Sequence, residues 1–303
     1  TTNTIVANHT AGVLAGTSDV LTVNLNTAKA ATLTTGAGFE SAKINVTGTN
    51  DLGGFTAPGV STLVLEGTGS LNANDDFTSV GTLTATGMTG ALTTGTVGTD
   101  GFVDKVITGA TAGSSILLGS GADNIGFSNT GATGSSTINL GAGNDKLEFN
   151  AAGAAVYVFG EAGDDSISAI TSPLASTDMI DGGAGNDTLI LDGSAANSAM
   201  VMRSIENVTV TGSGAADKAQ DFTNDDSATA ITFKAVDNSI VNLAGLSAGS
   251  TVKVDKATGF TGAVDALTVG FANTEAAATI DVNADIDGAM STSKITAVTY
   301  DFA

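Results

Sequence analysis

Four short stretches decide the fold: LGSGADNI at 118–125, LGAGNDKL at 140–147, GEAGDDSI at 160–167 and GGAGNDTL at 182–189. Each has an aspartate at its sixth position and an apolar residue two positions later. The aspartates are Asp123, Asp145, Asp165 and Asp187, and the apolar residues are Ile125, Leu147, Ile167 and Leu189. Because the aspartates recur at spacings of 22, 20 and 22 residues, we expect one structural unit to repeat and stack as a solenoid.

A second pattern, in the first third of the chain, has a matching period. Two apolar residues two positions apart are followed by one residue and then a glycine. The sets are Ile44, Val46 and Gly48; Leu63, Leu65 and Gly67; and Leu83, Ala85 and Gly87. A weaker copy has Ile107 and Gly109, and the pattern returns at 208–212. The shared period predicts that one solenoid runs through both regions.

Short β-type runs fill the sequence between the turns. Val, Ile, Leu and Thr alternate between Gly, Asn, Asp and Ser clusters, which is typical of strands and turns. The stretches SNTGATGSS, NAAGAA and TSPLAST lie between the acidic turns and carry no carboxylate. We therefore predict coils of two strands, one acidic turn and one plain turn, with strands at 147–149 and 156–159. The fold class is all-β, a largely parallel β-solenoid, with one short helix around 215–222.

Composition excludes several classes of function. The chain has 303 residues, 31 acidic and 10 basic, for a net charge of −21, and no cysteine. A polyanion with a single arginine, Arg203, is unsuited to nucleic acid, and the only histidine, His9, argues against a zinc site. No apolar run approaches the roughly 18 residues that span a bilayer, so we expect no membrane insertion. The start at Thr1, without a signal-peptide pattern, suggests a processed chain or a fragment.

The acidic turns have the chemistry of a calcium site. Glycines allow left-handed backbone, so that carbonyl oxygens can point to one spot, and each aspartate adds a carboxylate. Stacked rungs lie about 4.8 Å apart, and two carboxylates at that distance repel by roughly 1–3 kcal/mol, depending on the dielectric. A hard dication with 6–8 oxygen ligands removes this repulsion, and Ca²⁺ suits such a site better than Mg²⁺.

Residues 118–190 resemble RTX repeats, the glycine- and aspartate-rich calcium-binding β-rolls of bacterial secreted proteins. GGAGNDTLI matches the nonapeptide fully, LGAGNDKLE and LGSGADNIG lack its first glycine, and GEAGDDSIS has Glu161 in place of its second. We predict a single row of Ca²⁺ ions along the acidic edge. The predicted ligands are Asp123, Asp145, Asp165, Asp187, Gly119, Gly121, Gly141, Gly143, Asn144, Gly163, Asp164, Gly183, Gly185 and Asn186.

The flanks resemble the Thr- and Gly-rich β-repeats of surface-layer proteins of Gram-negative bacteria. The matching segments are VSTLVLEGTGS, SIENVTVTGSG and DVLTVNLN. The resemblance implies type I secretion, an extracellular location on the bacterial cell surface, and self-assembly into a calcium-dependent two-dimensional array. The implied partners are copies of the same chain, bridged by Ca²⁺, with a cell-surface polysaccharide as a further candidate.

We divide the chain into a Thr-rich β region (1–110), a calcium β-roll (111–195) and an acidic β region (196–303). By count of charged residues their net charges are −5, −9 and −7. The expected function is structural, and we expect no enzyme, since no HExxH, GxSxG or P-loop motif is present. The alternatives are an RTX adhesin or biofilm protein that binds a glycan, and the carrier region of a secreted hydrolase.

Other acidic stretches are either calcium sites or ordinary strands and turns. DVNADIDG at 281–288 imitates the start of an EF-hand, but a strand with an acidic outer face is favoured. NANDDF at 72–77 and FTNDDS at 222–227 are paired-acid turns or ordinary Asx turns. Three aspartates flank the fourth motif and are candidates to extend the ion row: Asp178, Asp181 and Asp192.

Overall fold

The computed structural model of the chain is an all-β protein of parallel strands stacked as a β-solenoid, which confirms the predicted fold class. No described segment forms a helix long and apolar enough to cross a membrane. The structure describes residues 4–7, 16–29, 31–73, 77–94, 106–110, 112–169, 173–192, 197–211, 218–234, 240–244, 250–255, 268–272, 279–281 and 297–300. The chain divides into two units, Thr1–Asp165 and Ser166–Ala303, and each is described by itself.

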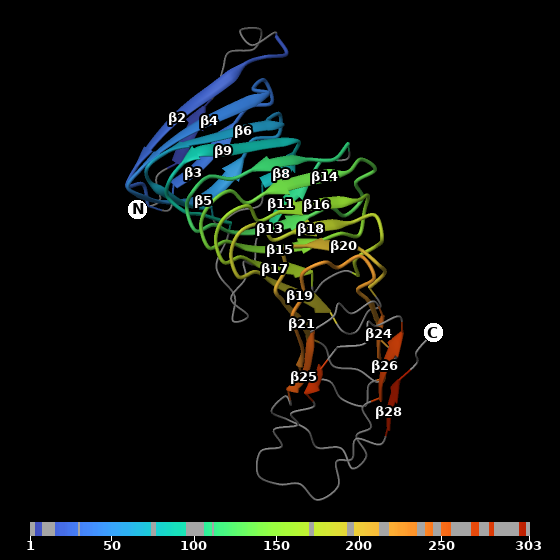
Figure 1. The fold of residues 1–303 in the computed structure, drawn as a ribbon. Coiled ribbons are helices and arrows are strands. Elements are labelled where there is room, and N and C mark those ends of the chain that lie inside the picture. The colour runs from blue at the N-terminus through green and yellow to red at the C-terminus, as the bar shows by residue number, and fades with distance from the viewer. Residues whose placement is uncertain are drawn as a thin grey trace, which may run out of the picture. The chain divides into compact units, whose positions relative to one another are not determined.

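Unit 1 consists of two parallel sheets whose strands alternate along the chain, as the stack in Figure 1 shows. Sheet 1 contains, in spatial order, β2 (Val20–Asn26), β4 (Ser41–Thr47), β6 (Thr62–Gly67), β9 (Thr82–Met88), β12 (Ser115–Leu117), β14 (Ser136–Asn139) and β16 (Val156–Phe159). Sheet 2 contains β1 (Thr4–Ala7), β3 (Ala31–Thr35), β5 (Thr49–Thr56), β7 (Ser70–Ala73), β10 (Leu92–Thr94), β13 (Asn124–Ser128) and β15 (Lys146–Asn150). Two further strands, β8 (Phe77–Val80) and β11 (Val106–Gly109), pair with each other, and β11 also pairs with β13.

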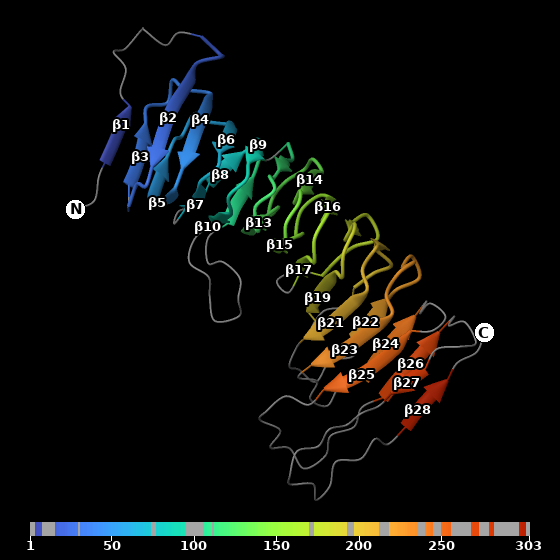
Figure 2. The ribbon, with the colours of Figure 1, turned by 60° about the vertical axis from the view of Figure 1, so that its left-hand side comes forward.

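Unit 2 has the same parallel construction. One sheet contains β17 (Ser166–Ala169), β19 (Thr188–Asp192), β21 (Asn207–Thr211), β23 (Ala230–Lys234), β25 (Thr251–Asp255) and β27 (Thr279–Asp281). A pair is formed by β18 (Met179–Asp181) and β20 (Val201–Arg203). A further sheet, seen face-on in Figure 2, contains β22 (Lys218–Asp221), β24 (Ile240–Ala244), β26 (Thr268–Ala272) and β28 (Ala297–Tyr300).

The core of unit 1 is a set of apolar columns that run from rung to rung. Ala42, Leu63 and Leu83 are in register on β4, β6 and β9, and all three are 0% exposed. Ile44 pairs with Leu65, so this step spans 21 residues and not the 19 that the glycine spacing suggested. The two spacings differ by one side-chain repeat and both keep the apolar residues inward, so strand alternation alone could not distinguish them.

The predicted continuity between the first third and the middle of the chain is confirmed within unit 1. Strand β9 pairs with β12, and β10 pairs with β13. Strands β15 and β16 contain the segments predicted at 147–149 and 156–159. Ile125 and Leu147 are in register and 0% exposed, as are Ile167 and Leu189 in unit 2.

The predicted short helix was wrong. Residues 218–221, inside the helix expected at 215–222, form β22, because they pair in parallel with β24. The glycine pattern occurs on strands of both sheets: β4, β6 and β9 belong to sheet 1, whereas Ile107 lies on β11, which pairs with β13 of sheet 2. Two apolar residues two positions apart describe any half-buried strand, so the pattern cannot distinguish the sheets.

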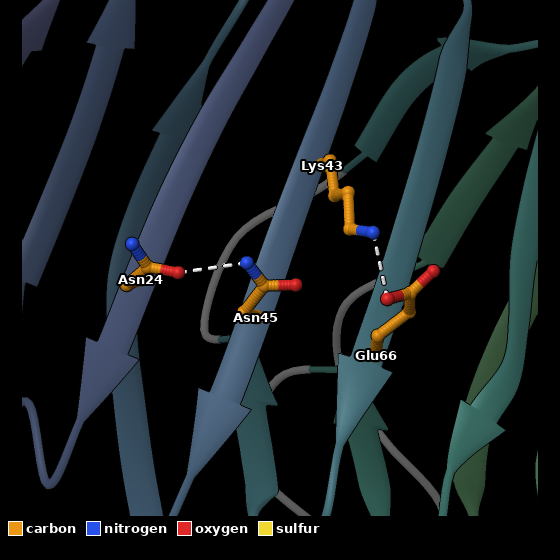
Figure 3. A network of polar contacts seen from close by, with 4 residues as sticks. All are labelled: Asn24, Lys43, Asn45 and Glu66. Carbon is orange, nitrogen blue, oxygen red and sulfur yellow. Dashed lines mark hydrogen bonds and ion pairs between the residues drawn. The ribbon is translucent and has the colours of Figure 1, made fainter.

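The outer face of sheet 1 carries polar side chains that meet across rungs (Figure 3). Asn45 Nδ2 donates to Asn24 Oδ1 at 2.7 Å, and Lys43 Nζ lies 2.7 Å from Glu66 Oε2. The ion-pair side chains are 37% and 45% exposed, so we assign the pair little net stabilisation. The apolar inner columns therefore hold the stack together, and the outer face can vary.

Two adjacent residues of β6 test this division. Leu65→Ala should lower the free energy of unfolding by about 2–5 kcal/mol, because it opens a cavity in a fully buried column. Val64→Ala, on the half-buried outer face, should change it by less than about 1 kcal/mol. Urea denaturation of both variants measures the difference, and equal losses would contradict the assigned faces.

Candidate metal centre

The acidic turns stack on one another at one edge of the solenoid. In unit 1 they occupy 118–123, 140–145 and 160–165, directly after β12, β14 and β16. Backbone hydrogen bonds join successive turns: Ala142 N donates to Gly119 O at 2.9 Å, and Ala162 N donates to Gly141 O at 3.1 Å. The turns therefore continue the parallel ladders around the corner. These hydrogen bonds orient the carbonyl groups of the turns without an ion.

Glycine is required in the second and third turns for two reasons. Gly141, Gly143 and Gly163 have φ values of 91°, 132° and 137°, in the left-handed region that the repeat pattern predicts. A Cβ on Gly163 would also collide with the carbonyl oxygen of Gly143 in the turn below. In the first turn, Gly119 and Gly121 are not among the positive-φ glycines, so this turn has a different backbone path.

The three aspartates of unit 1 lie inside this edge. Asp123, Asp145 and Asp165 are 3%, 1% and 2% exposed. Each accepts, through Oδ1, a hydrogen bond from a backbone N–H of the rung before it. The bonds are Leu92 N to Asp123 at 2.6 Å, Asp123 N to Asp145 at 2.7 Å, and Asp145 N to Asp165 at 2.8 Å. We call these three residues the carboxylate column.

Unit 2 repeats the arrangement with one residue that the sequence pattern missed. Asp187 is 0% exposed and directly precedes β19, and Gly183 and Gly185 have φ values of 93° and 152°. Its backbone N–H donates to Glu206 Oε2 at 2.7 Å. Glu206 directly precedes β21, as Asp187 directly precedes β19, and the first residues of the two strands are in register. An acidic residue immediately before a strand was the sequence signal that could have identified Glu206.

The residues at the fifth position of the turns lie apart from the column. Asn144, Asp164 and Asn186 are exposed. Asn144 Oδ1 accepts a hydrogen bond from Asp164 N at 3.0 Å, and Asn186 Oδ1 accepts one from Asn207 Nδ2 at 2.5 Å. The predicted ligand set thus divides into buried carboxylates and exposed side chains that link the outer rims of neighbouring turns.

Burial changes the protonation of the column. Desolvation raises the pKa of Asp123 from 3.8 to about 7, against the opposing effect of hydrogen bonds from Leu92 and Gly119. Desolvation also raises the pKa of Asp145 to about 7, and the nearby charge of Asp123 adds to the rise. A hydrogen bond from Asp123 N opposes it. Near neutral pH and without a cation, Asp123 and Asp145 are therefore only partly ionised.

A buried carboxylate oxygen of the column has the properties of a cation ligand. Asp145 Oδ2 is buried and has no hydrogen-bond partner, although its Oδ1 is bonded. A buried carboxylate oxygen without a partner is costly, and a hard dication would satisfy it. The described residues contain no group of three or more acidic, His or Cys side chains that could hold a metal ion. An ion here would therefore depend on turn carbonyls and water as well as on Asp145.

At the opposite edge of unit 1, the corners before β12 and β14 are held by neutral groups, whereas the corner before β2 and β4 uses Glu40, which accepts from Asp19 N at 2.9 Å. Ser114 Oγ donates to Val80 O at 2.7 Å, and Ser114 N donates to Ser136 Oγ at 3.1 Å. Ser136 Oγ donates to Asn129 Oδ1 at 2.9 Å, and Asn129 Nδ2 donates to Ala154 O at 2.5 Å. These buried hydroxyl and amide groups satisfy one another without charge.

The remaining acidic candidates have other roles or lie outside the described residues. Asp178 directly precedes β18, and its Oδ2 accepts a hydrogen bond from Ala175 N at 2.8 Å, so it closes a turn away from the 182–187 turn. Asp225 Oδ1 accepts from Ser227 N at 3.0 Å and Ala228 N at 3.1 Å, as an Asx turn does. The acids at 75–76 and 282–288 lie outside the described residues.

Comparison of the chain with protein-family models, with curated proteins and with solved structures finds no match. The function must therefore be inferred from the fold and from the carboxylate column.

The raised pKa values predict an unusual pH dependence. Because the folded pKa values of Asp123 and Asp145 are about 7 and the ordinary value is 3.8, the folded chain binds more protons between these limits. Without calcium, its stability should therefore fall as pH rises from about 4 to about 7, by about 1.4 kcal/mol per unit of pKa shift for each group. Thermal melting in chelator at pH 5 and pH 8 measures this.

Asp145→Asn keeps an oxygen acceptor for Asp123 N and removes the charge. It should raise stability at pH 8 and flatten the pH dependence. Asp51→Asn, on β5 and away from the acidic turns, removes the same charge and should leave the dependence unchanged. An unchanged slope in Asp145→Asn would contradict the assignment of the raised pKa.

Glu161 gives an independent test of the turn geometry. It has a φ of 72° where a full repeat has glycine, and its Oε1 accepts a hydrogen bond from Asn139 Nδ2 at 2.5 Å. A left-handed non-glycine residue costs roughly 1–2 kcal/mol, so Glu161→Gly should stabilise the chain by about 1 kcal/mol. Glu161→Ala loses the same carboxylate but keeps the strain and should not. Equal stability of the two variants, measured by urea denaturation, would contradict the strain.

Proposed function

We propose that the chain is a structural protein of the bacterial cell surface that folds on binding Ca²⁺ and then assembles into a two-dimensional array. The observation that carries the proposal is the carboxylate column, in which Asp145 has a buried oxygen without a partner and a raised pKa. The resemblance of the acidic turns to RTX repeats supports the choice of Ca²⁺.

The proposed mechanism couples export to folding. In calcium-poor cytoplasm the net charge of −21 and the buried, uncompensated column disfavour the folded state, which keeps the chain open for type I secretion. Outside the cell, the calcium concentration exceeds the dissociation constant of about 10⁻⁴–10⁻³ M that is common in extracellular modules. Binding to the folded form alone then stabilises it by about 1.4 kcal/mol at a tenfold excess of calcium over Kd.

Assembly is the second step of the proposal. The stacked sheets give each unit long regular faces, and the charge outside the middle third remains acidic, at −5 for 1–110 and −7 for 196–303 by count. Acidic faces repel one another unless a dication bridges them. Calcium would thus act within the coils and between copies. In an RTX adhesin, calcium would also bind within the coils, but the copies of the chain would not assemble into an array.

A calcium titration tests both steps on the same samples. Circular dichroism should show a gain of parallel β-structure with a midpoint of about 10⁻⁴–10⁻³ M calcium, and negative-stain microscopy should show ordered arrays. Magnesium at the same concentrations should be weaker, because it requires a tight octahedron. β-structure without arrays would overturn the array proposal and favour the adhesin or the carrier region.

Two matched variants test whether the calcium response depends on the carboxylate column. Asp145→Asn should lose most of the calcium-dependent rise in melting temperature, whereas Asp51→Asn should keep it. A full calcium response in Asp145→Asn would show that the ion binds elsewhere.

A further inference from the structure

A strip of unpaired hydroxyl groups crosses the outer face of sheet 1 in unit 1. Ser115, Thr137 and Tyr157 are in register on β12, β14 and β16, and they alternate with inward residues that are 0% exposed. All three are half-buried. Among the described residues, none of their hydroxyls has a hydrogen-bond partner, so three successive rungs offer hydroxyls to an external group.

A second row runs beside the first. Asn139 and Phe159 are in register on β14 and β16, two positions after Thr137 and Tyr157. Phe159 and Tyr157 therefore project from the same face of one strand. Glu161 follows Phe159 by two positions and is exposed, and Asn139 Nδ2 donates to its Oε1 at 2.5 Å. This bond fixes the amide and the carboxylate next to the aromatic pair.

The aromatic pair differs from the core phenylalanines among the described residues of unit 1. Phe77, Phe127 and Phe149 lie in the core of unit 1, with at most 1% of each exposed. Tyr157 and Phe159 instead present their rings on the outer face of β16, where solvent reaches part of them. An exposed ring beside fixed polar groups suits a ligand that has one apolar face and several hydroxyls. Sugar rings have this combination, since their C–H faces stack on aromatic rings and their hydroxyls both donate and accept.

The negative charge of the chain favours a neutral glycan over an anionic one. The strip contains one charged group, Glu161, which accepts hydrogen bonds and repels anions. The chain as a whole carries −21, so a polyanionic glycan would approach against its field. We propose that Ser115, Thr137, Tyr157, Asn139, Phe159 and Glu161 form a binding strip for a neutral polysaccharide that lies across the rungs. This binding does not depend on array formation.

Calorimetric titration tests the proposal on the full chain in calcium-containing buffer. The probes are cellohexaose and maltohexaose as neutral glycans and polygalacturonate as the anionic one. At least one neutral probe should bind, and polygalacturonate should not. Phe159→Ala should weaken binding at least tenfold. The control is Val64→Ala, an outward apolar residue on β6 in the same row of sheet 1, which should bind like the parent chain.

Two further variants keep the test decisive if Phe159→Ala folds poorly. Tyr157→Phe removes only a hydroxyl, and Asn139→Ala removes only the amide that holds Glu161; each should weaken binding severalfold with an unchanged circular dichroism spectrum. Binding of neither neutral probe, equal binding of polygalacturonate, or unchanged affinity in these variants would overturn the strip. Array formation is scored separately by microscopy, so failure of one proposal leaves the other measurable.

Discussion

The structure depends on one constraint: at each corner, where the chain leaves one sheet for the other, a backbone N–H must find an acceptor. Polar side chains of the following rung supply it. Asn50 accepts from Ala28 N at 2.9 Å, Asp123 from Leu92 N at 2.6 Å, and Asn197 from Leu174 N at 2.7 Å. Buried N–H groups are almost always paired, so this requirement selects a polar residue at the corner before any functional role is added.

The same constraint separates the structural from the functional part of the carboxylate column. Asn50 and Asn197 show that an amide is a sufficient acceptor at a corner, and both are nearly fully buried. An aspartate there brings a charge that the hydrogen bond does not require, together with a second oxygen that in Asp145 has no partner. At the opposite edge, the corners before β12 and β14 use the neutral side chains of Ser114 and Ser136. The excess charge of the acidic edge is what a calcium ion would use.

Most of the fold followed from the sequence, because period and alternation are properties of the chain itself. The 22- and 20-residue spacing predicted the stacking of unit 1, and the apolar residue after each aspartate predicted the columns that contain Ile125 and Leu147. Details that depend on contacts between rungs did not follow. The glycine spacing aligned Ile44 with a residue two positions from its true partner, Leu65. Glu206 was not predicted as part of the acidic edge, because residues 197–206 contain no glycine. The burial of Asp145 also required the structure, since a turn residue is ordinarily exposed.

The corner hydrogen bonds give the solenoid a direction. In each of them the donor belongs to one rung and the acceptor to the next along the chain, as from Asp19 to Glu40, from Ser114 to Ser136 and from Asp187 to Glu206. A rung is therefore complete only after its successor is in place. Loss of rungs from the C-terminal side would remove these side-chain acceptors from the last rung kept, whereas loss from the N-terminal side would remove only the N–H groups that donate to them. The two ends of such a stack are chemically different surfaces.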